Sequence, residues 1–344
     1  MKRIGFLFEK LISRENLSLA IKNASKGKST YKIVQKMAEK PDKYIEILYD
    51  LLSNNKYKHA DYVIKYIHDK GKLREIKKTA FFPDRVIHHA VIQVINPILN
   101  KHFIAHTYQS IIGKGVHKAV DYAYKSVRKQ DAKYALLLDI TKFYPSVNND
   151  YLMSLFRRII KDKKMLNIIA EIVYSTEGLP IGNFTSQPFG NFSISDIDHY
   201  AKEKLGLKYY VRYADDILIL GESKEYLHKV RVILTKMLTD RWLKVKPNYQ
   251  VFDITIRSPD YLGYILTQEG KRLRKSTKRR FIRLMQRNVW NKRTISALVS
   301  YLGWLGHANT KRLIATYFTN EVKQAIRQYG VHHSIPSIIL KEIG

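Results

Sequence analysis

Two adjacent aspartates, Asp215 and Asp216, interrupt the stretch YYVRYADDILIL, which is otherwise rich in β-branched and aromatic residues. Successive side chains of a strand point to opposite faces, so both carboxylates cannot reach solvent from one continuous strand. We therefore predict a hairpin of two short strands with Ala-Asp-Asp at its tip. Neighbouring carboxylates repel each other unless a hard divalent cation such as Mg²⁺ lies between them and another carboxylate. The alternative is an ordinary solvated Asp-Asp turn.

A third carboxylate is available in Asp139, which directly follows the apolar stretch YALLL. If that stretch is a strand, Asp139 stands at its end, where the position of a side chain is well fixed. Three carboxylates suit phosphoryl transfer assisted by two Mg²⁺ ions, for which Mn²⁺ is a substitute. We predict Asp139 and Asp215 as the principal metal ligands and catalytic residues, with Asp216 assisting.

The segment DITKFYPSV carries the chain from Asp139 through Pro145 toward a predicted helix. We expect backbone N–H groups of residues 140–144 to face a triphosphate and Tyr144 to form the floor beneath its sugar. An aromatic ring there excludes a 2′-hydroxyl group sterically and so selects deoxynucleotides. The alternative is that Phe143 and Tyr144 are only core aromatics.

The elements before these residues are predicted from periodicity and turn signals. Residues 1–68 are expected to be helical, because apolar residues recur at threes and fours in YIEILYDLL and ADYVIKYI. Gly71 and Pro83 flank a short basic strand pair, and Asp84 is expected to cap a helix that begins near Arg85.

The middle of the chain alternates between apolar strand patterns and helical patterns. YALLLDI is a predicted strand, and DYLMSLFRRIIKD and FTSQPFGNFSISDIDHYAKEKL are predicted helices that precede the aspartate hairpin. The fold class expected from this order is mixed α/β, of the α+β kind.

Positive charge dominates the composition. The 344 residues include 61 Lys and Arg against 30 Asp and Glu, a formal net charge of +31, together with 24 Tyr. Residues 271–293 carry eleven cations and no anion, and we expect them to form a helical subdomain with a basic face. Such a field favours an anionic partner, and aromatic rings among the cations favour nucleic acid. For the net charge, the alternative is a merely basic, soluble protein without a nucleic-acid partner. For residues 271–293, it is a solvated charged helix that binds nothing.

Cysteine and membrane signals are absent from the sequence. Without any cysteine the chain forms no disulfide, and it has no run of the roughly 18 apolar residues that a membrane span needs. Glu9 and Lys10 interrupt the apolar start before it reaches signal-peptide length. We expect a cytoplasmic protein without a membrane partner.

Four motifs in order, DITKFYPSV, LPIGNFTSQPFGN, YADD and DYLGYIL, resemble the palm motifs of reverse transcriptases. Upstream, GKLREI, FFPDRVIHHAV and IIGKGVHKAV resemble the fingers, and SYLGWLGHANT resembles a thumb. The resemblance implies a right-hand polymerase with an N-terminal helical extension (1–68), fingers (69–133, with parts of 160–180), a palm with an antiparallel sheet plus helices (134–266), and a basic helical thumb with a C-terminal tail (267–344).

The resemblance also implies binding residues. On the basic fingers hairpin, Arg74 and, as a weaker candidate, Lys72 are expected to grip the triphosphate, although either could instead contact the template backbone. The expected dNTP-binding residues are Arg74, Lys72, Phe143, Tyr144, Ile181 and Gly182. The expected primer grip consists of Tyr261, Leu262 and Gly263, where glycine would admit the primer backbone. Lys244 and Lys246 are both candidates for a general acid, and their register stays open.

The loop from Leu179 to Gln187 indicates which class of reverse transcriptases the chain resembles. Most reverse transcriptases carry a glutamine before the glycine and then Ser-Pro, whereas this chain has Ile181-Gly182-Asn183 and Ser186-Gln187. This variant resembles the reverse transcriptases of diversity-generating retroelements, which are bacterial or phage-encoded. The resemblance implies a mutagenic enzyme that copies a template-repeat RNA into cDNA with errors at adenines, in a ribonucleoprotein, with a small, basic, oligomeric accessory variability protein.

Alternatives to this class remain. An aliphatic Ile181 penalises a mismatch mainly through shape, so we hypothesise that it relaxes fidelity. The alternative is that Ile181 is simply a packed loop residue. Another bacterial reverse transcriptase, of the group II intron or retron type, is the first alternative for the whole chain. The second is a catalytically silent RNA-binding protein with a polymerase fold.

Overall fold

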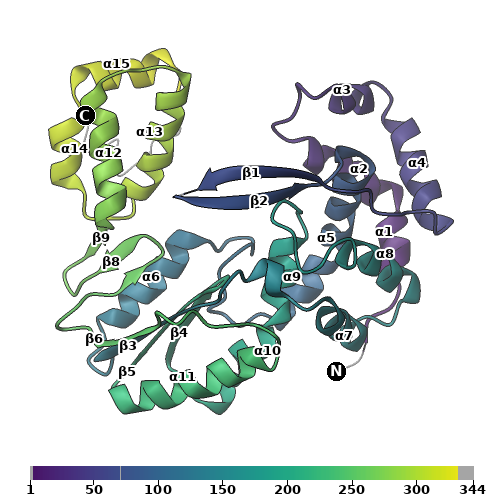
Figure 1. Cartoon of the computed structure of the whole chain (residues 1–344). Coiled ribbons are helices and arrows are strands. Elements are labelled where there is room, and N and C mark those ends of the chain that lie inside the picture. The colour runs from purple at the N-terminus through teal and green to yellow at the C-terminus, as the bar shows by residue number, and fades with distance from the viewer. Residues whose placement is uncertain (1–2, 70, 332–344) are drawn as a thin grey trace.

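The computed structural model describes residues 3–69 and 71–331 (Figure 1). Helices occupy the N-terminal part, as predicted: α1 Leu7–Ile12, α2 Arg14–Ser25, α3 Lys32–Glu39 and α4 Pro41–Ser53. The side chain of Ser13 caps α2 by accepting a hydrogen bond from the Asn16 N–H group. Asn16 also links α2 to α5 (Val86–Leu99), because its side-chain amide donates to the Ala90 carbonyl.

A long hairpin follows these helices and projects toward the C-terminal helices (Figure 1). Strand β1 (Val63–Asp69) pairs antiparallel with β2 (Lys72–Lys78). The helix predicted for ADYVIKYI is therefore wrong, and the predicted boundary at residue 68 falls inside β1. The apolar residues of this segment satisfy a helical period, but their β-branched and aromatic types also suit a strand, and pairing with β2 decides.

Asp84 does not cap α5, contrary to the prediction. The residue at the cap position is Arg85, and its side chain makes no capping hydrogen bond. Asp84 is instead buried and accepts a hydrogen bond of 3.0 Å from the Tyr57 hydroxyl. A capping position was a reasonable expectation for an aspartate after proline, but a buried tyrosine partner 27 residues earlier in the chain cannot be foreseen from local pattern.

The central sheet has four antiparallel strands in the order β4-β5-β3-β6. Their bounds are β3 Tyr134–Asp139, β4 Tyr209–Tyr213, β5 Asp216–Gly221 and β6 Gln250–Asp253. Helix α11 (Lys224–Thr239) packs on one face, and α6 (Val116–Val127) contacts β4 and β5 from the other. Because both faces are covered, Ala135, Leu136 and Leu138 are all buried, which explains the continuous apolar run in β3.

The remaining helices connect the fingers to the central sheet. The segment predicted as one helix after the Gly/Pro loop is divided at Ile194 into two short helices and a π-helical turn. The three pieces are α9 Ser186–Ser193, α10 Ser195–His199 and η4 Tyr200–Lys204. The other helical elements of this part are η1 Phe81–Arg85, η2 Asn100–His102, η3 Tyr144–Ser146, α7 Asn149–Ile159 and α8 Lys163–Val173.

A small sheet leads into the C-terminal helices, which stand apart from the N-terminal helices, with the β1–β2 hairpin reaching toward them (Figure 1). Its strands are β7 Asp260–Tyr261, β8 Tyr264–Leu266 and β9 Lys271–Leu273, so it crosses the predicted boundary at residue 266. The helices are α12 Lys275–Arg287, α13 Lys292–Leu305, α14 Lys311–Tyr317 and α15 Asn320–Gln328. The predicted C-terminal tail lies, from residue 332 onward, outside the described residues.

Two apolar cores lie on the two sides of the central sheet. The first joins the N-terminal helices to the face under α11, and the second joins the α6 face to β8 and the C-terminal helices. Helices and antiparallel sheets are combined in the arrangement expected for fingers, palm and helical thumb, which confirms the predicted fold class. None of the helices in the described residues is long and apolar enough to cross a bilayer.

Candidate active site

The hairpin predicted around the two aspartates is present. Tyr213 at the end of β4 pairs with Asp216 at the start of β5, so Ala214 and Asp215 form a two-residue turn. Ala214 has a φ of 53°, the left-handed conformation that such tight hairpin turns require. The turn places Asp215 at the tip and Asp216 on the first position of the strand.

The third aspartate lies beside this turn. Asp139, the last residue of β3, is directly opposite Asp216 in the β3–β5 pair, and opposed residues point to the same face. The Ile140 N–H group donates to the Asp215 carbonyl at 3.3 Å, which ties the segment after Asp139 to the turn. The sheet therefore gathers the three predicted carboxylates at one end.

Burial and mutual repulsion raise the pKa values of two of these groups. Burial, followed by the charges of Asp215 and Asp139, raises the pKa of Asp216 to about 7. Burial and the Asp139 charge also raise the pKa of Asp215, while Lys246 and Arg74 oppose that rise. The three carboxylates concentrate negative charge, and the nearby cations Lys246 and Arg74 offset it only in part. Such an excess of negative charge favours the binding of a positive ion.

Lys246 is the cation nearest to Asp139. Its ammonium group forms an ion pair with the Asp139 Oδ2 atom, and its backbone N–H group donates to the Asp139 carbonyl at 2.8 Å. The bridge between Ile140 and Val245 sets this register, which sequence alone left open between Lys244 and Lys246. Lys244 is exposed.

The three carboxylates are chemically suited to a hard divalent cation, although the described side chains do not form a complete coordination site. The buried Asp139 Oδ1 atom has no hydrogen-bond partner among the described residues, and carboxylate oxygens are the ligands that Mg²⁺ prefers. No group of three or more His, Cys, Asp or Glu in the described part of the chain is arranged to hold a metal ion. Lys246 on the other oxygen of Asp139 supplies the positive charge in this arrangement.

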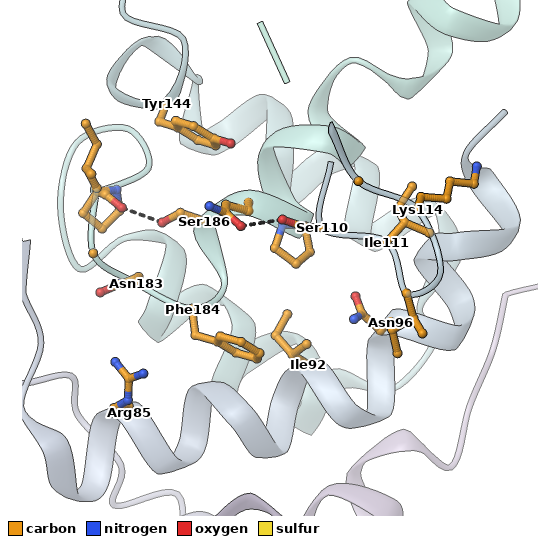
Figure 2. A pocket seen from close by; sticks show the side chains of 17 residues that line it. Arg85, Ile92, Asn96, Ser110, Ile111, Lys114, Tyr144, Asn183, Phe184 and Ser186 are labelled. Atoms are coloured by element: carbon orange, nitrogen blue, oxygen red, sulfur yellow. Dashed lines mark hydrogen bonds between the residues drawn. The ribbon is translucent and has the colours of Figure 1, made fainter. Parts of the chain in front are cut away.

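A cavity of about 670 Å³ opens between α5, the loop 110–115 and the loop 180–188. Tyr144, Ile181 and Gly182 line it, and Arg85 and Phe184 lie across from Tyr144 (Figure 2). Phe143 does not line it, because its ring is 2% exposed within the core. The structure thus brings three of the predicted dNTP-binding residues to one cavity and leaves Phe143 behind its wall.

The loop 180–182 is held against the fingers hairpin. The Lys77 N–H group donates to the Ile181 carbonyl at 3.0 Å, and a Cβ atom on Gly182 would lie 2.5 Å from the Lys77 carbonyl oxygen. Gly182 has a φ of 134°, so both its conformation and its contact with β2 require glycine. The end of β2 is thereby fixed beside the loop that lines the cavity.

The predicted backbone cradle for a triphosphate is incomplete. The Ile140 N–H group donates to Asp215, and the Thr141 N–H group donates to the Lys244 carbonyl at 2.7 Å. Two of the five expected donors are therefore already used to attach this segment to the neighbouring strands. The expectation from the turn at Pro145 overlooked these long-range partners.

Arg74 is placed near the aspartates. Its positive charge partly opposes the rise in the pKa of Asp215 that burial and the Asp139 charge cause. It is opposite Ile67 in the hairpin, on β2. Lys72 is the first residue of the same strand, and its side chain lies outside the described part of the structure.

The predicted primer grip is the turn between β7 and β8. The buried Tyr261 hydroxyl donates to the Asp216 carbonyl at 3.4 Å, which connects this hairpin to the aspartate strand. Leu262 and Gly263 form the turn, both with positive φ. A Cβ atom on Gly263 would lie 2.6 Å from Cζ3 of Trp304. In this structure the close approach that requires glycine is to Trp304 of the thumb, and the contact of this turn with a primer backbone stays a prediction.

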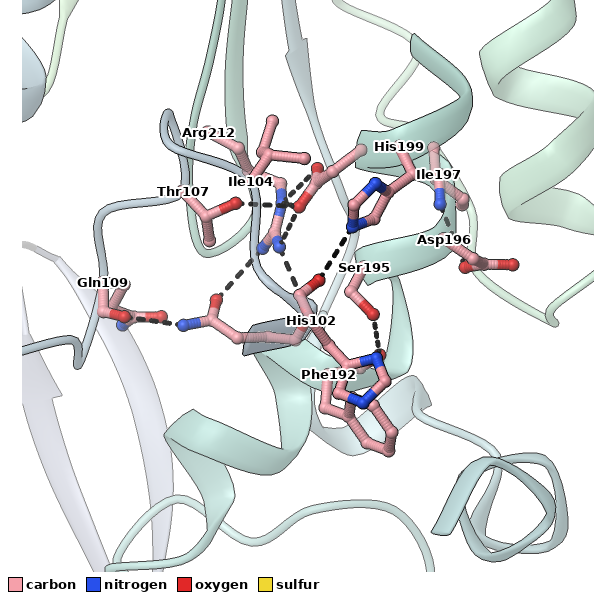
Figure 3. A network of polar contacts seen from close by, with 12 residues as sticks. His102, Ile104, Thr107, Gln109, Phe192, Ser195, Asp196, Ile197, His199 and Arg212 are labelled. Atoms are coloured by element: carbon pink, nitrogen blue, oxygen red, sulfur yellow. Dashed lines mark hydrogen bonds and ion pairs between the residues drawn. The ribbon is translucent and has the colours of Figure 1, made fainter. Parts of the chain in front are cut away.

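A buried ion pair supports the aspartate turn from behind. Arg212 in β4 and Asp198 in α10 are both fully buried and form two-pronged hydrogen bonds (Figure 3). The Arg212 guanidinium also donates to the Ala214 carbonyl at 3.1 Å and to Asn191 at 3.0 Å. This network holds the backbone of the turn that carries Asp215.

Sequence reasoning missed two residues of this site: Arg212, and Gln109, whose side-chain Oε1 atom accepts a hydrogen bond of 2.7 Å from the Tyr144 hydroxyl. It named Lys246 as a candidate beside Lys244 and could not choose between them. Arg212 gives a signal in hindsight, because an arginine inside the apolar stretch YYVRY must find a buried anion. Gln109 gives none, since a glutamine in a loop is ordinary and its contacts depend on the tertiary structure. Lys246 required the strand register.

Comparison with known proteins agrees with this geometry. The sequence pattern described as reverse transcriptase (RNA-dependent DNA polymerase) matches residues 67–266, more than half of the chain. The protein belongs to the reverse transcriptase family.

Individual relatives are distant. Nuclear intron maturase 1, mitochondrial, from Arabidopsis thaliana is 25% identical over 104 residues, which are 29% of this chain and 14% of the maturase. Telomerase from Candida albicans, in complex with a TWJ fragment of telomeric RNA, has a similar fold: the TM-score is 0.50 at 14% identity, over 85% of this chain and 62% of that one. Apo telomerase from Candida tropicalis gives a TM-score of 0.49 at 15% identity, over 83% and 57% of the two chains. The chain spans less than two thirds of each relative.

Proposed function

We propose that this chain is an RNA-directed DNA polymerase that extends a primer with dNTPs on an RNA template. The observation that carries the proposal is the convergence of Asp139, Asp215 and Asp216 at one end of the palm sheet in a member of the reverse transcriptase family. A protein that only binds RNA has no need for three carboxylates beside an anionic ligand.

Each side chain has a role in this proposal. Asp139, Asp215 and Asp216 would hold divalent ions, Mg²⁺ or Mn²⁺ in its place, and these ions would supply charge neutralisation for the primer 3′-oxygen and the pyrophosphate. Arg74 binds the triphosphate from the fingers hairpin. Tyr144 closes the space beneath the sugar. Its ring packs directly on Gly190, where a Cβ atom would lie 2.9 Å from the Tyr144 Cε1 atom, so the ring cannot move away in that direction.

The template and primer are bound through the basic surface. The thumb contributes much of it, since Arg272, Lys278, Lys311 and Arg312 line a cavity of about 630 Å³ at its base. Phosphate groups attract such a surface without regard to sequence, which suits an enzyme that must move along its template.

Within the family, we place the chain in the diversity-generating retroelement class. The support is Ile181-Gly182-Asn183 and Ser186-Gln187 in the loop, together with the position of Ile181 on the cavity wall. The enzyme would copy a template-repeat RNA with errors at adenines and so diversify a variable-repeat gene. It would act in the cytoplasm of a bacterium, encoded there or by a phage, with a small basic accessory variability protein.

A second candidate is an enzyme of the group II intron type. The match to an intron maturase over 104 residues favours it. The two candidates differ in accuracy, because the retroelement class is defined by errors at template adenines.

Primer extension on an RNA template with Mg²⁺, followed by sequencing of the cDNA, tests both levels. We expect incorporation by the wild type, none by Asp215→Ala/Asp216→Ala, and errors concentrated opposite adenine. Faithful cDNA would retain the polymerase and favour the second candidate. Wild-type protein that makes no cDNA, even with its native template and a basic accessory protein, would overturn the polymerase itself.

A further inference from the structure

The Tyr144 hydroxyl group is not free. It donates a hydrogen bond of 2.7 Å to the Oε1 atom of Gln109, a residue 35 positions earlier in the chain. The ring is held from below as well, because Gly190 contacts its edge so closely that any side chain there would collide with it. Gly190 therefore limits the ring at one side and Gln109 fixes the hydroxyl end.

Gln109 is itself anchored to the framework of the aspartate turn. Its backbone carbonyl accepts a hydrogen bond of 2.6 Å from the Asn191 side chain, which in turn binds Arg212. The segment before Gln109 runs along β4: the Tyr108 N–H group donates to the Arg212 carbonyl at 3.1 Å, and the Arg212 N–H group donates to the His106 carbonyl at 3.0 Å. Figure 3 shows Gln109 at the edge of this network.

The same residues therefore hold two parts of the site. Arg212 fixes the Ala214 carbonyl in the aspartate turn and, through Asn191, the backbone of Gln109. Tyr144 also lies near the turn, since the Asp215 charge contributes to raising the pKa of its hydroxyl group. One hydrogen-bonded network thus contacts both the Tyr144 hydroxyl, through Gln109, and the aspartate turn, through Arg212.

We propose that Gln109 is a positioning residue for sugar selection: its side-chain carbonyl holds the Tyr144 ring where a 2′-hydroxyl group would collide with it. The inference rests on the proposed function of Tyr144. The hydrogen bond acts in two ways. It restricts rotation of the ring, and it occupies the hydroxyl proton that would otherwise be donated to the 2′-hydroxyl of a ribonucleotide.

The test compares dCTP with CTP incorporation by the full-length chain on a primed RNA template. Replacing Gln109→Leu removes the acceptor at similar volume, and we expect the relative use of CTP to rise roughly two- to tenfold, the effect of one lost hydrogen bond. The change should lie mainly in the KM for CTP. Gln109→Glu retains an acceptor oxygen and should restore most of the discrimination.

Two further variants separate positioning from general damage. Tyr144→Phe lacks the donor, so adding Gln109→Leu to it should have little further effect on the CTP/dCTP ratio. Gln268→Leu removes a glutamine that donates to the Val127 carbonyl, remote from Tyr144 in the chain, and should leave the ratio unchanged. Thermal unfolding of each variant shows whether the fold is intact.

The outcomes distinguish this inference from the function beneath it. If Tyr144→Ala raises CTP use but Gln109→Leu does not, Gln109 has no positioning role and the inference is overturned. If Tyr144→Ala also leaves the ratio unchanged, sugar selection by Tyr144 falls too. Absence of any incorporation by the wild type would overturn the polymerase and the inference together.

Discussion

Ile181 is the residue on which the proposed loss of accuracy depends. Its side chain lines the cavity beside Tyr144, and its carbonyl is fixed by the Lys77 N–H group, so a substitution changes the chemistry of the wall with the backbone in place. An aliphatic wall offers no polar group that a misaligned nucleotide would leave unpaired.

We predict that Ile181→Gln lowers misincorporation opposite template adenine by roughly tenfold, because an unpaired buried amide penalises a mismatch. Sequencing of cDNA made by the variant measures the effect. Ile181→Leu, which keeps the wall apolar, serves as the control and should retain the wild-type error rate. An unchanged error spectrum in Ile181→Gln would assign Ile181 to packing alone.

Single residues differed in how far the sequence revealed them. The aspartates could be predicted because charge inside an apolar run is costly and needs a reason. The sequence predicted that Gly263 permits a close approach, but it could not predict the partner. That partner, Trp304, lies 41 residues away in the thumb. The geometry that joins Lys246 to Asp139 depended on a strand register that no local pattern encodes.

Among the elements, the β7–β8 hairpin determines where the thumb attaches. Trp304 of α13 packs against the turn, its ring stacks on Tyr264 with centroids 5.2 Å apart, and the Tyr264 hydroxyl donates to the Trp304 carbonyl at 3.2 Å. The stacked rings of His117 and His307 extend this contact from α6 to the thumb.

Gly263→Ala should therefore loosen the thumb attachment. A methyl group would meet Trp304 and would also need the positive φ of 86°, so we expect a loss of about 1–3 kcal/mol in the free energy of unfolding. Chemical denaturation measures it. Gly270→Ala should change stability little, because its φ is ordinary and a Cβ atom there would lie at an ordinary contact distance of 3.8 Å from the Asn309 Cβ atom; equal effects of the two variants would contradict the role of Trp304.

The buried pair of Arg212 and Asp198 gives a second prediction about an element, the β4–β5 hairpin. Asp198→Ala leaves an unpaired buried arginine and should cost about 3–5 kcal/mol of unfolding free energy. The control is Asp131→Ala, which breaks the more exposed ion pair with Lys208 and should cost less than about 1 kcal/mol. Urea unfolding curves of similar midpoint for the two variants would refute the structural role of Asp198.

Elements with a single strong pattern were predicted well, and ambiguous ones were not. The β4–β5 hairpin followed from two apolar runs around a polar turn, and α4 followed from its periodicity. In β1, the residues Val63, Ile64, Tyr66 and Ile67 suited helix and strand alike. Their side chains are exposed, so no buried face distinguished the two possibilities; only the pairing with β2 did.

On the scale of the whole molecule, the excess of 31 positive charges must act through particular surfaces. The cavity at the base of the thumb is one of them, with four cations along its wall. Because RNA releases counterions when phosphates are neutralised, each contact contributes to the salt dependence of binding.

We predict that Lys278→Gln/Arg312→Gln weakens binding of primed RNA and makes the negative slope of log association constant against log salt concentration shallower by about 0.7 for each lost contact. Fluorescence anisotropy at several salt concentrations measures the slope. Lys43→Gln, an exposed cation on α4, is the control and should leave the slope unchanged. A slope unaltered in the double variant would exclude this cavity from the RNA-binding surface.

The order of strands in the palm has a consequence for folding during synthesis on the ribosome. β3 lies between β5 and β6, so the strand that ends in Asp139 has neither neighbour until the chain has been synthesised past residue 221 and then past residue 253. Pairings across such separations form slowly, because a long loop must close first. A ribosome-bound chain therefore carries an apolar β3 without a strand partner at least until synthesis has passed residue 221, and chaperones or premature RNA contacts would meet an intermediate in that state.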